Sequence, residues 1–157
     1  TVTGVQTCAL PILSIMECEF PTTNANNEEI TAIFKEVKTV AVAGLSPNES
    51  KPSHFVPKYL QDAGYKIYPI YPKEDEIMGE KVYRSLAEIE ESIDMVVVFR
   101  KPDAVPAILD AVLAKGDVKV LWLQQGIVHN ESANRATKAG LRVVQNKCTM
   151  VEHRAHA

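Results

Sequence analysis

The chain has 157 residues, of which 46% are hydrophobic and 24% are charged, and its formal net charge is -3 at pH 7. This length fits one domain with a substantial hydrophobic core. The slightly negative charge argues against general nucleic-acid binding, which requires a basic surface to displace counterions. Cys8, Cys18 and Cys148 are too few and too scattered for a disulfide framework, and they fit a reducing cytoplasm.

Residues 1–15 are expected to form a non-native or disordered tail. The first twelve residues read TVTGVQTCALPI, which resembles the translated read-through of a sequencing adapter, so we expect the native chain to begin near Met16. A native flexible tail is the alternative. The apolar run from Ala9 to Met16 is too short to span a bilayer, and no basic residue precedes it as in a signal peptide. We therefore expect no membrane partner.

From residue 28 onward, helical and strand-like patterns alternate along the chain. The expected elements are a helix over 28–37, a strand over 38–43, a helix over 53–63, a strand over 66–71, a short strand near 81–83, a helical turn over 86–91, a strand over 93–99, a helix over 103–115, a strand over 118–123, a helix over 130–139 and a strand over 141–145. Residues 72–79 are expected to form a loop, and His153 and His156 are expected to lie in a fraying tail. Asn26 and Glu29 have the spacing of a capping box for the first helix.

Glycine ends three of the helical patterns, at Gly64, Gly116 and Gly140, and a strand follows within two residues each time. A left-handed glycine at this position lets a helix turn tightly into the next strand. The strand over 93–99 is apolar on both sides apart from Asp94, so it should lie centrally. These features predict a single α/β domain over residues 28–153, with a mainly parallel, doubly wound (Rossmann-type) sheet covered by helices on both faces.

In such a sheet the ligand lies beyond the carboxyl ends of the strands, where the strand order reverses. The loop after the first strand begins with Gly44 and runs through Ser46 to Ser53 before a helix starts. The unpaired N–H groups of a helix start favour phosphate. Only one of the three glycines of the dinucleotide fingerprint is present, so the loop predicts phosphate binding but not NAD binding. Ser46 and Ser53 are candidate phosphate ligands, with helix capping as the alternative for either.

Two cations follow other strands of the predicted sheet. Lys73, after Tyr71 and Pro72, stands where NAD-binding folds carry an acidic residue, and it suits a ribose phosphate; a solvated surface lysine is the alternative. Arg100 ends the central strand, where its guanidinium can take a phosphate through two hydrogen bonds. The alternative for Arg100 is an ion pair with Asp103 or Glu131.

The remaining candidates carry weaker signals. Gly126 permits either a close backbone approach after its strand or a tight turn. Trp122 and Phe99 are expected to pack in the core rather than to stack on a base. Cys148 is interpreted as a buried, inert cysteine, with a free thiol that faces the ligand as the alternative. The sequence contains no nucleophile elbow and no phosphate-binding P-loop motif, so no catalytic or metal-binding residue is predicted.

Six ordered segments of the sequence carry a family resemblance. They are VAVAGLSPNESKPSH, YLQDAGYKIYPIYPK, GEKVYRSLAEI, IDMVVVFRKPDAVP, VLWLQQGI and CTMVEH. Together they closely resemble the small standalone coenzyme A-binding domain proteins, which are similar to the nucleotide-binding domain of the succinyl-CoA synthetase α-subunit. The resemblance implies a protein that binds coenzyme A or an acyl-CoA. It also implies that this chain makes no thioester by itself, because it lacks the ligase partner domain.

The resemblance also implies a set of cofactor-binding positions. They are Gly44, Leu45, Ser46, Ser53, Pro72, Lys73, Phe99, Arg100, Gln124 and Gly126. Two other functions stay open from the sequence: an NADP-linked oxidoreductase, and a ligand-free scaffold or thiol-redox partner on the same fold. The oligomeric state is open too, a homo-oligomer included.

Overall fold

The structure is a computed structural model that describes residues 20–157, so the expectations for residues 1–15 lie outside the described residues. Its main sheet has five parallel strands in the order β2-β1-β5-β6-β7. These strands are β1 (Thr39–Ala43), β2 (Lys66–Ile70), β5 (Met95–Val98), β6 (Val120–Leu123) and β7 (Arg142–Val144). The strand expected to be central is indeed the middle one, β5. The prediction of a parallel, doubly wound α/β sheet is therefore confirmed.

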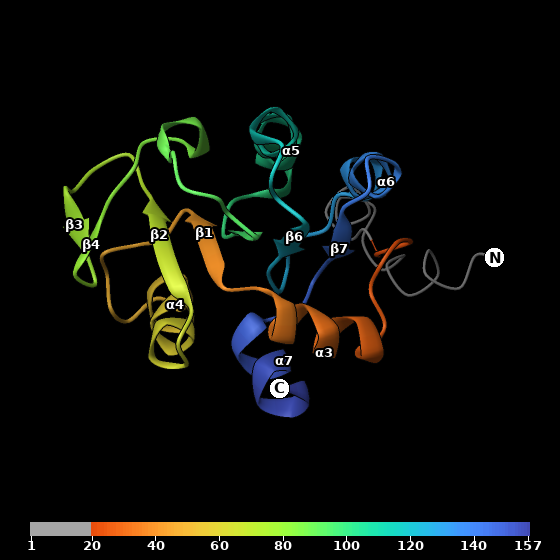
Figure 1. Cartoon of the computed structure of the whole chain (residues 1–157), viewed down its shortest axis with the longest axis horizontal. Coiled ribbons are helices and arrows are strands. Elements are labelled where there is room, and N and C mark those ends of the chain that lie inside the picture. The colour runs from red at the N-terminus through yellow and green to blue at the C-terminus, as the bar shows by residue number, and fades with distance from the viewer. Residues whose placement is uncertain (1–19) are drawn as a thin grey trace, which may run out of the picture.

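Helices cover both faces of the sheet (Figure 1). The helices are α3 (Asn27–Glu36), α4 (Pro52–Asp62), α5 (Val105–Lys115), α6 (Asn130–Lys138) and α7 (Thr149–His156), and the short 3-10 turns are η1 (Leu86–Glu88) and η2 (Pro102–Ala104). Helices α5 and α6 lie on one face, and α3, α4 and α7 lie on the other. The chain thus forms three layers, as right-handed crossovers between parallel strands require.

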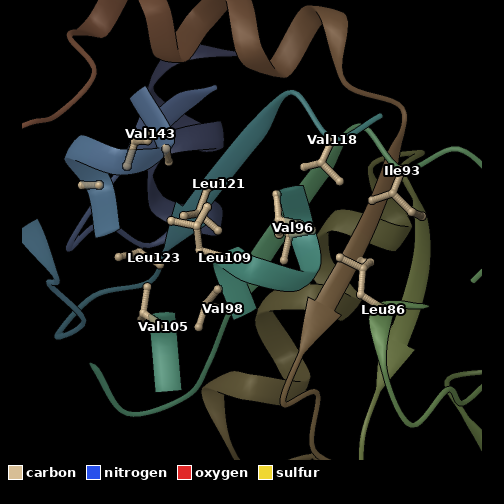
Figure 2. Close-up of a cluster of buried hydrophobic side chains, with 14 of the residues drawn as sticks. Leu86, Ile93, Val96, Val98, Val105, Leu109, Val118, Leu121, Leu123 and Val143 are labelled. Carbon is tan, nitrogen blue, oxygen red and sulfur yellow. The ribbon is translucent and has the colours of Figure 1, made fainter. Parts of the chain in front are cut away.

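The alternation of side chains along each strand divides the core between the two faces. On β5, Val96 and Val98 pack toward α5, whereas Met95 and Val97 pack toward the opposite face. Figure 2 shows the first of these clusters, in which Leu109 of α5 lies among the strand side chains. All four residues of β5 are apolar, so both sides of the strand can be buried, and every one of them is.

Polar contacts fix the start of helix α3 and the start of strand β1. Asn26 and Glu29 form the predicted capping box: the Glu29 backbone N–H donates to Asn26 Oδ1 at 2.8 Å, and the Asn26 N–H donates to Glu29 Oε1 at 3.0 Å. Just before β5, Asp94 Oδ2 accepts hydrogen bonds from the backbone N–H groups of Lys38 (2.8 Å) and Thr39 (3.2 Å). The one polar residue in the predicted central strand therefore anchors the start of β1.

The loop expected over residues 72–79 contains a strand. Strands β3 (Glu76–Ile77) and β4 (Glu80–Lys81) form an antiparallel hairpin. Its two turn residues, Met78 and Gly79, both have positive φ values, 58° and 77°. Two positive φ values are typical of the tight hairpin turn that matches strand twist. Methionine is an unusual residue at such a position, so only Gly79 signals the turn in the sequence.

The prediction that His153 and His156 lie in a fraying tail is wrong. Residues Thr149–His156 form helix α7, which packs against α3 and α4. The His153 ring lies edge-on against Phe34, Tyr59 and Tyr65, with centroid distances of 5.1, 5.4 and 5.8 Å. The Tyr59 hydroxyl is 2.8 Å from His153 Nδ1. Burial lowers the pKa of His153 below its ordinary value of 6.5. The helix is held by contacts with distant segments, which local sequence patterns do not display.

None of the helices between residues 20 and 157 combines the length and the hydropathy needed to span a lipid bilayer.

Candidate functional site

The strand order reverses between β1 and β5, and the carboxyl ends of three strands are tied together there. The Gly44 N–H donates to the carbonyl oxygen of Ile70, at the end of β2, and the Phe99 N–H donates to that of Ala43, both at 2.9 Å. In open parallel sheets this reversal point is the usual position of the ligand. The topology therefore brings the loops that follow β1, β2 and β5 to one place.

Gly44 allows these loops to approach closely. Its φ is +90°, a conformation that L side chains rarely adopt, and a Cβ atom at this position would lie 2.6 Å from the Phe99 carbonyl oxygen and 3.0 Å from Arg100 Cδ. Only glycine satisfies both constraints without a backbone shift. The single glycine of the loop after β1 is thus required by the packing of β1 against the loop after β5.

Two adjoining cavities lie at this end of the sheet in the described part of the chain; we call them together the strand-end cleft. The first has a volume of about 450 Å³ and is lined by Lys51, Pro52, Ser53, Phe99, Arg100, Lys101, Pro102, Gly126 and Ile127. The second has a volume of about 430 Å³ and is lined by Gly44, Ser46, Lys51, Ser53, Ile70, Tyr71, Pro72, Arg84, Phe99 and Arg100. Lys51, Ser53, Phe99 and Arg100 line both. Each volume is typical of a small-molecule pocket, about 300–1,000 Å³.

The lining of the cleft is basic although the chain as a whole is acidic. Four cations line it, Lys51, Arg84, Arg100 and Lys101, and no carboxylate from residues 20–157 does. The alternative ion pair of Arg100, with Asp103 or Glu131, is not formed among these residues. Arg100 is exposed, so its charge is available to an anion in the cleft.

The two candidate serines do not cap helix α4. The N-cap residue of α4 is Lys51, and no side chain accepts a hydrogen bond there. The Ser46 hydroxyl instead accepts a hydrogen bond from the Asn48 N–H at 3.1 Å, and Ser46 is buried. His54 Nδ1 is 2.7 Å from the Ser46 carbonyl oxygen. The helix start therefore faces the cleft without a side-chain cap, which leaves Ser53 at its first turn as a lining residue.

Seven of the ten predicted binding residues line the cleft, and three do not. The seven are Gly44, Ser46, Ser53, Pro72, Phe99, Arg100 and Gly126. Leu45 is fully buried in the core beside β1. Lys73 is exposed on the loop after β2, and its carbonyl oxygen accepts a hydrogen bond from Arg84. Gln124 is buried, and its side-chain amide makes two hydrogen bonds with Thr149. Gln124 Nε2 donates to Thr149 Oγ1 (2.9 Å), and the Thr149 backbone N–H donates to Gln124 Oε1 (3.2 Å).

Sequence reasoning missed some of the lining residues. Lys51, Pro52, Tyr71, Lys101 and Pro102 fall within the four segments that the sequence predicts to meet at the strand ends, which are 44–53, 71–73, 99–102 and 124–126. Ile70, Arg84 and Ile127 lie outside these segments. Arg84 reaches the cleft because Tyr83 forms an isolated parallel bridge with Ile70, the last residue of β2. That pairing extends the sheet edge by one segment. A short strand was expected near residues 81–83, but no local signal gave its partner.

Two residues singled out for other chemistry have structural positions. Trp122 is fully buried against Phe34, at a centroid distance of 5.3 Å, and its Nε1–H donates to the Lys147 carbonyl oxygen at 2.8 Å. The prediction of a core role for Trp122 is confirmed. The same prediction for Phe99 is wrong, because Phe99 is only partly buried and lines both cavities at the end of β5. Cys148 is a half-buried free thiol at the N-cap of α7. Among residues 20–157, no group of three or more His, Cys, Asp or Glu side chains is arranged to hold a metal ion.

Comparison with known proteins gives the family. The family model "CoA binding domain" matches residues 38–154, so the chain belongs to the CoA-binding domain family. The match begins just before β1 and ends within α7, and it includes every loop of the strand-end cleft.

Relatives of two kinds are similar to this chain. YneT of Bacillus subtilis is 39% identical over 130 residues, which cover 83% of this chain and 96% of YneT. The ADP-forming acetate–CoA ligase of Methanocaldococcus jannaschii is 32% identical over 118 residues, which cover 71% of this chain but only 17% of the ligase. A solved structure from Thermus thermophilus superposes with a TM-score of 0.80 at 38% identity and covers 85% of this chain and 100% of its own. The same domain therefore occurs both as nearly the whole of a small protein and as a minor part of a CoA ligase.

Proposed function

We propose that this protein binds coenzyme A or an acyl-CoA in the strand-end cleft. The observation that carries the proposal is the lining of the cleft: four cations and no described carboxylate, at the sheet's reversal point, in a chain of net charge -3. Such a lining favours a ligand with several phosphate groups. Membership of the CoA-binding domain family supports the choice of coenzyme A among such ligands.

In this proposal, the parts of the cleft bind different parts of the nucleotide. Arg100 and the start of α4 neutralise the pyrophosphate. Arg100 offers a charged guanidinium, and the start of α4 offers the Ser53 N–H, because Pro52 has no N–H and the His54 N–H donates to the Lys51 carbonyl oxygen. Phe99 and Ile127 provide an apolar surface for the adenine ring. The loop after β2 lies where doubly wound folds recognise the ribose.

Calorimetric titration with coenzyme A tests the proposal. We expect Arg100→Ala to weaken binding by about 10- to 150-fold, the ~1.5–3 kcal/mol of a hydrogen bond to a charged group. Arg135→Ala is the matched control, because Arg135 is a surface arginine on α6 that is paired with Asp110, outside the cleft lining. An unchanged affinity in Arg100→Ala would remove Arg100 from the site. Heats indistinguishable from dilution with the wild-type protein would refute the proposal as a whole.

Two further measurements separate the other functions that the sequence leaves open. An NADP-linked oxidoreductase would enhance NADPH fluorescence in a way that coenzyme A does not reverse. A ligand-free scaffold would carry no coenzyme A through purification, which mass spectrometry of the native protein detects. We also expect no thioester synthesis by this chain alone, since the aligned region is 17% of the ligase. A cytoplasmic location, expected from the few scattered cysteines, is part of the same proposal.

A further inference from the structure

The guanidinium of Arg84 occupies a distinctive place at the end of β2. It lines the second cavity together with Tyr71 and Pro72, which follow β2 directly. Arg84 comes from a different part of the sequence, after the β3–β4 hairpin, and the bridge between Tyr83 and Ile70 brings it there. No other cation from the segment that follows β2 lines the cleft.

One nitrogen of Arg84 shapes the loop after β2. Nη1 donates to the carbonyl oxygens of Tyr71 (3.0 Å), Lys73 (3.0 Å) and Glu74 (2.8 Å), so one of its two hydrogens is shared between two of these oxygens. Glu74 has a positive φ of 67°, so the backbone bends sharply around the guanidinium. These three bonds fix the guanidinium at the cavity wall, and a fixed charge loses less entropy when it binds an anion.

The rest of the guanidinium remains able to bind a ligand. Nη2 lies 3.7 Å from Oδ1 of Asp75, whose side chain is fully exposed, and Arg84 itself is about half exposed (45%). An exposed pair at this distance contributes little, and water screens it. The Arg84 charge is therefore not neutralised by a buried partner.

Lys73 lies differently, although the sequence favours it as the cation that meets a ribose phosphate. Its side chain is exposed and is absent from the described lining of both cavities. Its backbone carbonyl is one of the three oxygens that Arg84 holds. Doubly wound folds recognise the ribose with the residues at the end of their second strand, and here the guanidinium at that end of the cavity belongs to Arg84.

We propose that Arg84, rather than Lys73, is the residue by which this protein selects nucleotides with a phosphate on the ribose. This inference rests on the proposed function, since it assigns the 3′-phosphate of coenzyme A to Arg84. A planar guanidinium can give two parallel hydrogen bonds to one phosphate, which an ammonium group cannot. The expected consequence is a preference for coenzyme A over 3′-dephospho-coenzyme A.

The experiment measures both dissociation constants by calorimetry in wild type, Arg84→Gln and Lys73→Gln. We expect the wild type to prefer coenzyme A by about tenfold or more, as one charge-assisted contact provides. In Arg84→Gln this preference should fall to about threefold or less, because coenzyme A weakens while the dephospho form changes little. Lys73→Gln should keep the preference, as should the surface control Arg135→Gln.

Several results would overturn the assignment of Arg84. One is a wild type without preference; another is a preference that survives in Arg84→Gln or disappears in Lys73→Gln. Equal weakening of both nucleotides would mean that Arg84 only positions the loop. If Arg84→Gln does not fold, the Nε–H resonance of Arg84 in the wild type decides: it should shift with coenzyme A and much less with the dephospho form, and equal shifts contradict the assignment. Failure of the proposed function is distinct, because then neither nucleotide binds the wild type.

Discussion

Replacement of Gly44 by alanine should destabilise the protein through two separate effects. The first is conformational: at φ +90° an L residue costs about 1–2 kcal/mol, of which alanine recovers about 0.4–1 kcal/mol by restricting the unfolded chain. The second is steric. The new methyl group would lie 2.6 Å from the Phe99 carbonyl oxygen, a backbone atom that moves only if β1 and the loop after β5 separate. Such overpacking costs about 1–3 kcal/mol.

Gly116 is the matched control for the steric effect. Its φ is +84°, close to that of Gly44, but a Cβ atom there would meet nothing within 4 Å. We therefore expect Gly116→Ala to cost about 1 kcal/mol and Gly44→Ala about 3 kcal/mol, the difference being the clash with Phe99. For a protein of this size, these values correspond to Tm decreases of about 2–4 °C and 6–12 °C.

The assay is urea unfolding followed by the fluorescence of Trp122, the single tryptophan, which is fully buried in the folded state. The urea midpoint and the slope of the transition give the free energy of unfolding of each variant. Equal destabilisation of the two alanine variants would refute the argument, because the close approach of Phe99 to Gly44 would then carry no energetic weight.

Three further outcomes are expected elsewhere in the molecule. Because burial lowers the pKa of His153, the unfolded state takes up a proton at higher pH than the folded state, so the free energy of unfolding should decrease as the pH falls from 7.5 through 6.5 and below. Urea unfolding of His153→Phe should show a weaker pH dependence than the wild type, and an identical pH dependence would contradict this prediction. Gln124→Leu removes two buried hydrogen bonds to Thr149 and should lower the stability by about 2–3 kcal/mol, which scanning calorimetry measures. Part of the lost stability should return when Thr149→Val is added, and an unchanged Tm in Gln124→Leu would contradict the prediction. Asp94→Ala leaves the backbone N–H groups of Lys38 and Thr39 without their acceptor, so hydrogen exchange at these two amides should accelerate by roughly tenfold. Unchanged exchange at these amides would show that Asp94 does not stabilise the start of β1.

Local patterns were sufficient for the alternating elements. The left-handed glycines at 64, 116 and 140 have φ values of 105°, 84° and 96°, as expected of residues that end a helix before a strand. The capping box at Asn26 and the central position of β5 also followed from residue type and spacing. Each of these features depends on backbone conformation or on the burial of a short apolar run, which neighbouring residues largely determine.

Local patterns failed where distant segments supply the stabilising contacts. Helix α7 has few apolar side chains of its own, and its position depends on the aromatic cluster around His153 and on the Gln124 amide. Gln124, expected from the family resemblance to lie along the ligand crevice, has both ends of its amide bonded to Thr149. The polar character of a side chain gives no indication of whether it will face a ligand or another part of the chain.

The sequence by itself determined the fold class, the loop at Gly44 and the convergence of the strand ends, since strand alternation and helix-ending glycines leave few ways to arrange a parallel sheet. Arg100 was expected in the cleft from the sequence, but only the tertiary structure decided which cation joins it from the segment after β2: Arg84 lines the cleft and Lys73 does not. The reason is physical. A loop side chain is directed by the pairing of its flanking strand, and the partner of the segment that ends at Tyr83 is Ile70, 13 positions away in the sequence.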